Sequence, residues 1–129
     1  MAVSLSFVTV LARDLGALAD FYQDVFSLDD VSELNGQHFR GLRIGDTTLG
    51  FGGESSIEML NLPPSDLTDT PMMFWTFEAD TAAEVDALTE RAVAAGAQCI
   101  KAPGETYYGS WQAVLLDPEG NAFRINHTM

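Results

Sequence analysis

Cysteine and basic residues are scarce in this sequence of 129 residues. Cys99 is the single cysteine, so the chain cannot form an internal disulfide, and nothing indicates an oxidising compartment. Six Lys and Arg stand against nineteen Asp and Glu, which gives a formal net charge of −13. This charge repels phosphate backbones and anionic membrane surfaces and favours cationic molecules at long range. We therefore expect neither nucleic acid nor a membrane as a partner.

Long apolar runs are also missing. The N-terminal stretch "MAVSLSFVTVLARD" lacks the basic start and long apolar segment of a signal peptide, and no run reaches the length of a membrane span. There is no Ser-His-Asp order, phosphate-binding loop or CxxC motif. With 47% apolar residues, a chain of this length can bury the core of one domain, so we expect a single globular, cytoplasmic domain over residues 1–129.

The first half of the chain predicts a strand, a helix and three further strands. Alternating apolar residues indicate a strand at 5–12, and Asp14 is suited to cap a helix that begins with "LGALADFYQDVF". Three short strands are then predicted, at 31–34, 38–44 and 47–52. The segment that follows contains "IEML", a candidate short strand, and then a stretch rich in Pro, Ser, Thr and Asp that is typical of a connection.

The second half repeats this order. A strand is predicted in "MMFWTFEA", and Thr81 with Glu84 has the spacing of a capping box at the start of a helix that ends before Gly96. Strands are then predicted at 98–102, 111–116 and 122–127. Because self-similarity along a chain signals a repeated architecture, the pattern predicts two related modules.

The predicted fold class is α+β, with two βαβββ modules in tandem that form a curved mixed sheet around a concave cavity. Module one covers about 1–60, the connection about 61–71 and module two about 72–129. Each helix is expected to cover one face of its sheet, which leaves the other face available to a ligand.

This order resembles that of the vicinal oxygen chelate superfamily, which holds glyoxalases, extradiol dioxygenases, fosfomycin-resistance enzymes and bleomycin-resistance proteins. The resemblance spans nearly the whole chain. It rests on the duplicated order, on "ARDLGALADFYQDVFSL" after the first strand, and on "LLDPEGNAFRI" near the C-terminus. Its last hairpin turn is similar to "DPEGN" here.

The resemblance implies four places from which metal enzymes of the superfamily take ligands. By spacing, these places hold Phe7, Gly50, Phe74 and Arg124 in this sequence. Two phenyl rings, a glycine and a permanently charged guanidinium do not suit a divalent ion, which needs imidazole, thiolate or oxygen donors. We therefore expect no metal and no other cofactor, and the metal-dependent activities do not carry over to this chain.

The same resemblance, extended by strand alternation, predicts which residues line the cavity. Tyr107, Tyr108 and Trp111 are expected at its mouth, although Trp111 has the alternative of lying under a helix. Arg124 is expected either to contact the ligand or to pair with Glu78. The expected cavity-facing strand residues are Phe7, Thr9, Leu11, Met72, Phe74, Thr76, Glu78, Arg124 and Asn126. The alternate residues of the same strands point to the opposite face and are suited to packing beneath the helices. They are Val8, Val10, Met73, Trp75, Phe77, Phe123 and Ile125.

Three functions are compatible with this pattern. The first is metal-independent binding and sequestration of a bulky, aromatic antibiotic or natural product by a homodimer with pockets at or near the subunit interface, similar to the bleomycin-resistance branch. The second is a metal-independent isomerase, cyclase or lyase, with Glu78 as a general base of raised pKa and Arg124 holding a developing anion. The third is a metal enzyme with relocated ligands, drawn from the set His38, Glu58, Glu78 and His127.

Overall fold

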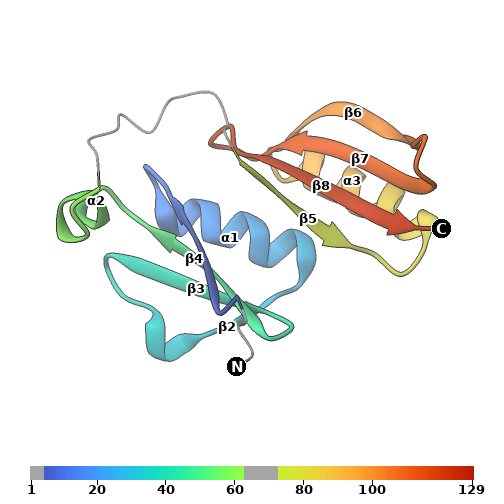
Figure 1. The fold of residues 1–129 in the computed structure, drawn as a ribbon. Helices are drawn as coiled ribbons and strands as arrows, with labels where there is room; N and C mark the ends of the chain where they lie inside the picture. Colours follow the sequence, from blue (N-terminus) through green and yellow to red (C-terminus); the bar gives the residue numbers. More distant parts are fainter. Residues whose placement is uncertain (1–4, 63–72) are drawn as a thin grey trace. The chain divides into compact units, whose positions relative to one another are not determined.

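A computed structural model describes residues 5–62 and 73–129 of the chain. The chain divides into two compact units, residues 1–69 and 70–129, which we describe separately as module one and module two. Each unit carries one four-stranded sheet and a long helix, as Figure 1 shows.

Module one begins with β1 (Phe7–Leu11) and α1 (Leu15–Phe26). Then follow a two-residue strand, a 3-10 turn, two longer strands and a short helix: β2 (Asp29–Asp30), η1 (Ser32–Leu34), β3 (Phe39–Ile44), β4 (Thr47–Gly52) and α2 (Ser55–Met59). The strand order in the sheet is β1-β4-β3-β2, with β1 parallel to β4 and the other pairs antiparallel.

The long helix of module one forms where the sequence supplies both its ends. The carboxylate of Asp14 accepts a hydrogen bond from the backbone N–H of Ala17 at 3.1 Å, which caps the first turn. At the other end Ser27 adopts a left-handed conformation with φ 54°. Between them Leu18, Tyr22 and Val25 are buried against the sheet, so the predicted helix is confirmed.

Module two consists of β5 (Phe74–Glu78), α3 (Ala82–Ala94), β6 (Gln98–Glu105), β7 (Ser110–Leu116) and β8 (Ala122–Thr128). Its strand order is β5-β8-β7-β6, with β5 parallel to β8 and the remaining pairs antiparallel. Both sheets thus share one topology, in which the first strand lies parallel beside the last strand of the module. The predicted α+β fold with tandem modules is confirmed.

The turn between β7 and β8 is held by Asp117, which is 4% exposed. Its carboxylate accepts hydrogen bonds from the backbone N–H groups of Glu119 at 2.9 Å and Asn121 at 3.0 Å. Gly120 has φ +87°, a conformation that side chains other than glycine's rarely adopt. The "DPEGN" segment therefore fixes the register in which β8 returns beside β7.

Side chains on the long strands alternate between a face covered by the helix and a face that it does not cover, which we call the open face. In module two Phe123 and Ile125 are fully buried on the covered face. Met73, which we predicted beneath the helix, is instead 71% exposed because it precedes β5 and lies outside the sheet.

Two other local predictions are wrong. The stretch "IEML", expected as a strand, lies mostly within α2. Residues 31–34, also expected as a strand, form the turn η1, and the short strand β2 lies just before them. Both segments are short and apolar in part, and such segments do not distinguish strand from helix by pattern.

Candidate functional site

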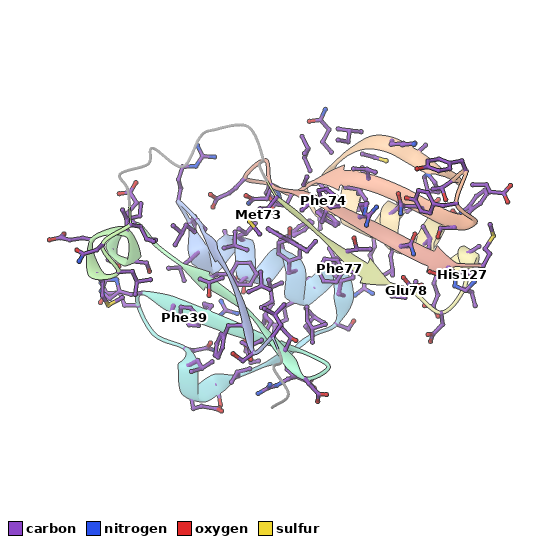
Figure 2. All side chains as sticks on the ribbon, in the orientation of Figure 1. Phe39, Met73, Phe74, Phe77, Glu78 and His127 are labelled. Carbon is purple, nitrogen blue, oxygen red and sulfur yellow. The ribbon has the colours of Figure 1, made fainter. Side chains whose placement is uncertain are left out.

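The open face of module two holds most of the predicted site residues. Alternation along β5 places Phe74, Thr76 and Glu78 on this face, and Figure 2 labels Phe74 and Glu78 near the two ends of β5. The parallel register sets Thr76 opposite Arg124 and Glu78 opposite Asn126. Because paired residues of neighbouring strands point to the same side, these side chains lie together.

Arg124 is bound by three neighbours on this face. Its Nε donates to the hydroxyl of Thr76 at 2.9 Å, and its Nη1 donates to the hydroxyl of Tyr108 at 3.4 Å. The guanidinium carbon lies 4.8 Å from the centroid of the Phe74 ring, a cation–π distance. Arg124 therefore has a fixed position above an aromatic ring.

A line of hydrogen bonds connects Arg124 to Glu78, and we call it the polar chain. Beyond the bond from Arg124, the Tyr108 hydroxyl donates to Oε1 of Gln112 at 3.0 Å. The Gln112 amide donates to Oδ1 of Asn126 at 2.8 Å, and the Asn126 amide donates to Oε1 of Glu78 at 2.9 Å. Gln112 and Asn126 are each 7% exposed, so the middle of the polar chain is buried, and its polar groups have hydrogen-bond partners.

Glu78 accepts hydrogen bonds at both oxygens. Besides the bond from Asn126, its Oε2 accepts from the backbone N–H of Thr128 at 2.8 Å. These two bonds lower the pKa of Glu78 below its ordinary value, because they stabilise the ionised form. The expected raised pKa of a desolvated general base is therefore wrong.

The ion pair with Glu78, one of the two roles expected of Arg124, is replaced by other contacts. Each of the two side chains binds partners of its own, and the polar chain runs between them. The parallel register explains the difference, because it sets Thr76 and not Glu78 beside Arg124.

The three aromatic residues predicted at the cavity mouth divide between the faces. Tyr107 is 101% exposed and Tyr108 is 52% exposed, and their rings meet edge to face at a centroid distance of 5.0 Å. Trp111 lies on the covered face, where its indole N–H donates to Asp86 of α3 at 2.8 Å. The prediction that Trp111 faces the cavity is therefore wrong, and its alternative under a helix is correct.

In module one the open face is partly filled from within. Phe7 is 44% exposed, and it shares β1 with Thr9 and Leu11 on the same face. A Cβ built on Gly50 would collide with the ring of Phe39, which therefore lies against the backbone of β4. Figure 2 labels Phe39 on β3. Sequence reasoning missed Phe39, although two glycines facing the same way on β4 are a signal for a large neighbour.

The four places implied for metal ligands do not fit a divalent ion. Phe7 and Phe74 carry no donor, Gly50 has no side chain and is covered by Phe39, and Arg124 is a cation engaged with Thr76 and Tyr108. Divalent metals in proteins need imidazole, thiolate or oxygen ligands. The residues at these four places therefore do not supply the donors that a divalent metal needs.

The relocated ligand set does not gather either. Within residues 5–62 and 73–129, no group of three or more His, Cys, Asp and Glu side chains is placed to hold a metal ion. Nδ1 of His38 lies 3.4 Å from the hydroxyl of Ser55, and Nδ1 of His127 lies 3.1 Å from the carbonyl oxygen of Ala79. Met72, predicted as a cavity residue, lies outside the described residues.

Module one also has an open hollow of about 500 Å³ at the start of α1, apart from the predicted site residues. Arg40 contributes to its wall and forms ion pairs with Asp20 at 3.2 Å and Asp30 at 3.5 Å. These carboxylates neutralise the guanidinium of Arg40, and the wall also holds Arg13 and Asp14, which carry opposite charges.

Two modules of one βαβββ topology, each with a sheet face that its long helix does not cover, define an α+β protein of repeated architecture. The model of the Glyoxalase/Bleomycin resistance protein/Dioxygenase superfamily matches residues 4–125, and the chain belongs to this superfamily. Comparison with curated proteins found no match. Within the described residues, no helix is both long and apolar enough to cross a membrane.

Solved structures support the same assignment. A glyoxalase/bleomycin resistance protein/dioxygenase family enzyme from Burkholderia phytofirmans is 42% identical, with a TM-score of 0.94, over 98% of this chain and 100% of that chain. A lactoylglutathione lyase from Agrobacterium tumefaciens is 26% identical, with a TM-score of 0.75, over 98% and 95% of the two chains. The fosfomycin resistance protein FosX from Listeria monocytogenes is 17% identical, with a TM-score of 0.75, over 100% and 94%, and shows the fold alone.

Proposed function

We propose that this protein binds and sequesters a bulky, aromatic small molecule, an antibiotic or natural product, without a metal ion. The observation that carries the proposal is the state of Arg124. By its spacing from Asp117, Arg124 stands where the superfamily resemblance implies a metal ligand, and its side chain contacts Thr76, Tyr108 and Phe74. A cation fixed at that place binds ligands by charge and stacking instead of by coordination.

Exposed aromatic side chains on module two supply the contact surface. Phe74 is 57% exposed, and Tyr107 and Tyr108 lie at the tip between β6 and β7. Stacking against such rings contributes about 0.5–1.5 kcal/mol per aromatic pair beyond the burial of area. A flat polycyclic ligand is the class that uses these rings best. By analogy with the superfamily, we propose that the protein acts in the cytoplasm as a homodimer with pockets at or near the subunit interface.

The test is calorimetric titration with a panel of polycyclic quinones, mitomycin-like, enediyne and glycopeptide-like compounds, with and without EDTA. At least one compound is expected to bind saturably, with the same Kd in both buffers, and to be recovered unchanged by mass spectrometry. Binding that requires added metal contradicts the proposal. Recovery of a changed compound instead favours the metal-independent isomerase, cyclase or lyase.

Two variants locate the binding surface. Phe74→Ala removes the ring beneath Arg124 and is expected to weaken binding about threefold to tenfold. Val93→Ala shortens a half-exposed apolar side chain on α3, away from the open face, and is expected to leave Kd unchanged. Equal effects of the two variants contradict placement of the ligand on the open face. Light scattering on the purified protein tests the homodimer.

A further inference from the structure

The unused hydrogen-bonding capacity of Arg124 indicates what kind of group the ligand carries. Nε is committed to Thr76, and Nη1 makes a long bond of 3.4 Å to Tyr108. Within the described residues, Nη2 has no hydrogen-bond partner. A guanidinium has five N–H donors in one plane and no acceptor, so the free edge of Arg124 favours an oxygen anion.

A second basic residue stands in the same row of the sheet. Val114 of β7 is paired with Arg124 of β8 on one side and with Lys101 of β6 on the other. Two strand spacings separate the two cations, roughly 10 Å between their Cα atoms. Two of the six basic residues of this acidic chain thus stand in one cross-strand row, on either side of an aliphatic residue, and β6 has a register shift on each side of Lys101.

The nearby carboxylate of Glu78 does not neutralise these two basic side chains. Glu78 lies in the next row of the sheet, and each of its oxygens already accepts a hydrogen bond from Asn126 or Thr128. Local donors therefore outnumber local acceptors at the Arg124 end of the face. The overall charge of −13 acts in the opposite sense, because at long range it favours cations.

From these contacts we infer that the ligand is an aromatic anion, with an ionised carboxylate, phenolate or enolate received by Arg124 and its ring system lying over Val114 or Phe74. The inference rests on the proposed function and adds the charge of the ligand to it. At contact distance, hydrogen bonds to a charged group outweigh the long-range field, which salt screens at physiological ionic strength.

The experiment compares three probes that share one ring system: an anthraquinone carboxylate, the matching carboxamide and the matching aminomethyl cation, substituted at the same ring position. Calorimetry at fixed ionic strength is expected to show that the carboxylate binds the wild-type protein about ten- to hundredfold more tightly than the carboxamide. Arg124→Gln is expected to bring this ratio close to one. Lys101→Gln is expected to reduce carboxylate affinity about twofold, as befits one charge about 10 Å away in water.

Arg91→Gln is the matched control, because it removes the same charge from α3 in the same module. It is expected to keep the full preference for the carboxylate. Equal affinities for carboxylate and carboxamide, a preference that survives Arg124→Gln, or tightest binding of the cation would each overturn the inference while leaving metal-free binding intact.

A smaller probe tests whether Arg124 binds a carboxylate even when the attached ring system is small. Benzoate and benzamide are titrated into isotope-labelled protein while the side-chain Nε–H resonance of Arg124 is followed by NMR. Benzoate is expected to shift this resonance, and benzamide is not. If neither benzoate nor the anthraquinone carboxylate moves it, the inference is wrong whichever neutral compounds bind. The proposed function fails separately, if no member of the antibiotic panel binds without metal.

Discussion

Asn126→Asp exchanges one nitrogen for one oxygen in the buried middle of the polar chain, and we expect it to destabilise the protein strongly. In the wild-type protein Nδ2 of Asn126 donates to Glu78 at 2.9 Å, and Asn126 is 7% exposed. The substitution removes a hydrogen bond to a charged acceptor, which contributes about 1.5–3 kcal/mol. It also sets two carboxylates against each other, which costs about 1 kcal/mol at roughly 4 Å in water. Together they predict a loss of about 2.5–4 kcal/mol at pH 7.

The loss is expected to depend on pH and on Glu78. As the pH falls toward acid, the paired carboxyls share a proton, the repulsion disappears, and the variant recovers part of its stability relative to wild type. Glu78→Gln, added to Asn126→Asp, supplies an amide donor in place of the second carboxylate and is expected to restore at least about 1 kcal/mol at pH 7.

Urea unfolding of the wild-type protein, both single variants and the double variant measures this coupling in a double-mutant cycle. Gln98→Glu is the control, because it adds the same charge at an exposed position of the same module. It is expected to change the free energy of unfolding by less than about 0.5 kcal/mol. Additive effects in the cycle, or a loss from Asn126→Asp no larger than that of the control, would refute the hydrogen bond between Asn126 and Glu78.

Three further predictions follow from other contacts. Because its pKa is lowered in the folded state, Glu78 stabilises the fold above the pKa of an unfolded glutamate, and this stability is lost as pH falls through the lowered value. Glu78→Gln should therefore flatten the acid decline in urea-unfolding free energy, and parallel curves would contradict this. Asp117→Ala leaves the backbone N–H of Asn121 without its acceptor and should cost about 1–3 kcal/mol by the same assay; a loss within error argues against the turn assignment. Gly50→Ala should lower Tm because its Cβ meets the ring of Phe39, and Phe39→Leu should recover part of that loss; a Tm unchanged by Gly50→Ala would contradict the contact.

The fold could be predicted from the sequence where capping residues and hydrophobic periodicity indicated the same element. Asp14 marks the start of α1 and an apolar stripe fills its length, so the predicted and observed helix coincide. The "DPEGN" turn was likewise predicted from sequence, and counting residues from its Asp117 identified Arg124. The prediction for "IEML" failed because four residues carry too little periodicity, and its helix is set by tertiary packing, with Ser56 lying against Gly52.

For the site, the sequence predicted only which face of a strand each residue lies on. Alternation correctly assigned Phe74, Thr76, Glu78 and Arg124 to one face, but it says nothing about which residues of parallel strands stand opposite each other. That register placed Thr76 beside Arg124 and removed the expected ion pair. The polar chain was missed for the same reason, since Gln112 joins it from β7. A shift of one position decides the face of Trp111, and sequence did not settle that shift.

The polar chain also determines the direction in which Tyr108 can interact with an incoming molecule. Every bond of the chain is donated from the Arg124 side toward Glu78, so the one hydroxyl proton of Tyr108 is already directed to Gln112. Its oxygen therefore presents a lone pair to a ligand, while the guanidinium beside it presents N–H groups. Two neighbouring atoms of opposite polarity therefore favour an acid that carries a hydroxyl or amine beside its carboxylate, with the carboxylate at Arg124 and the added donor at the Tyr108 oxygen.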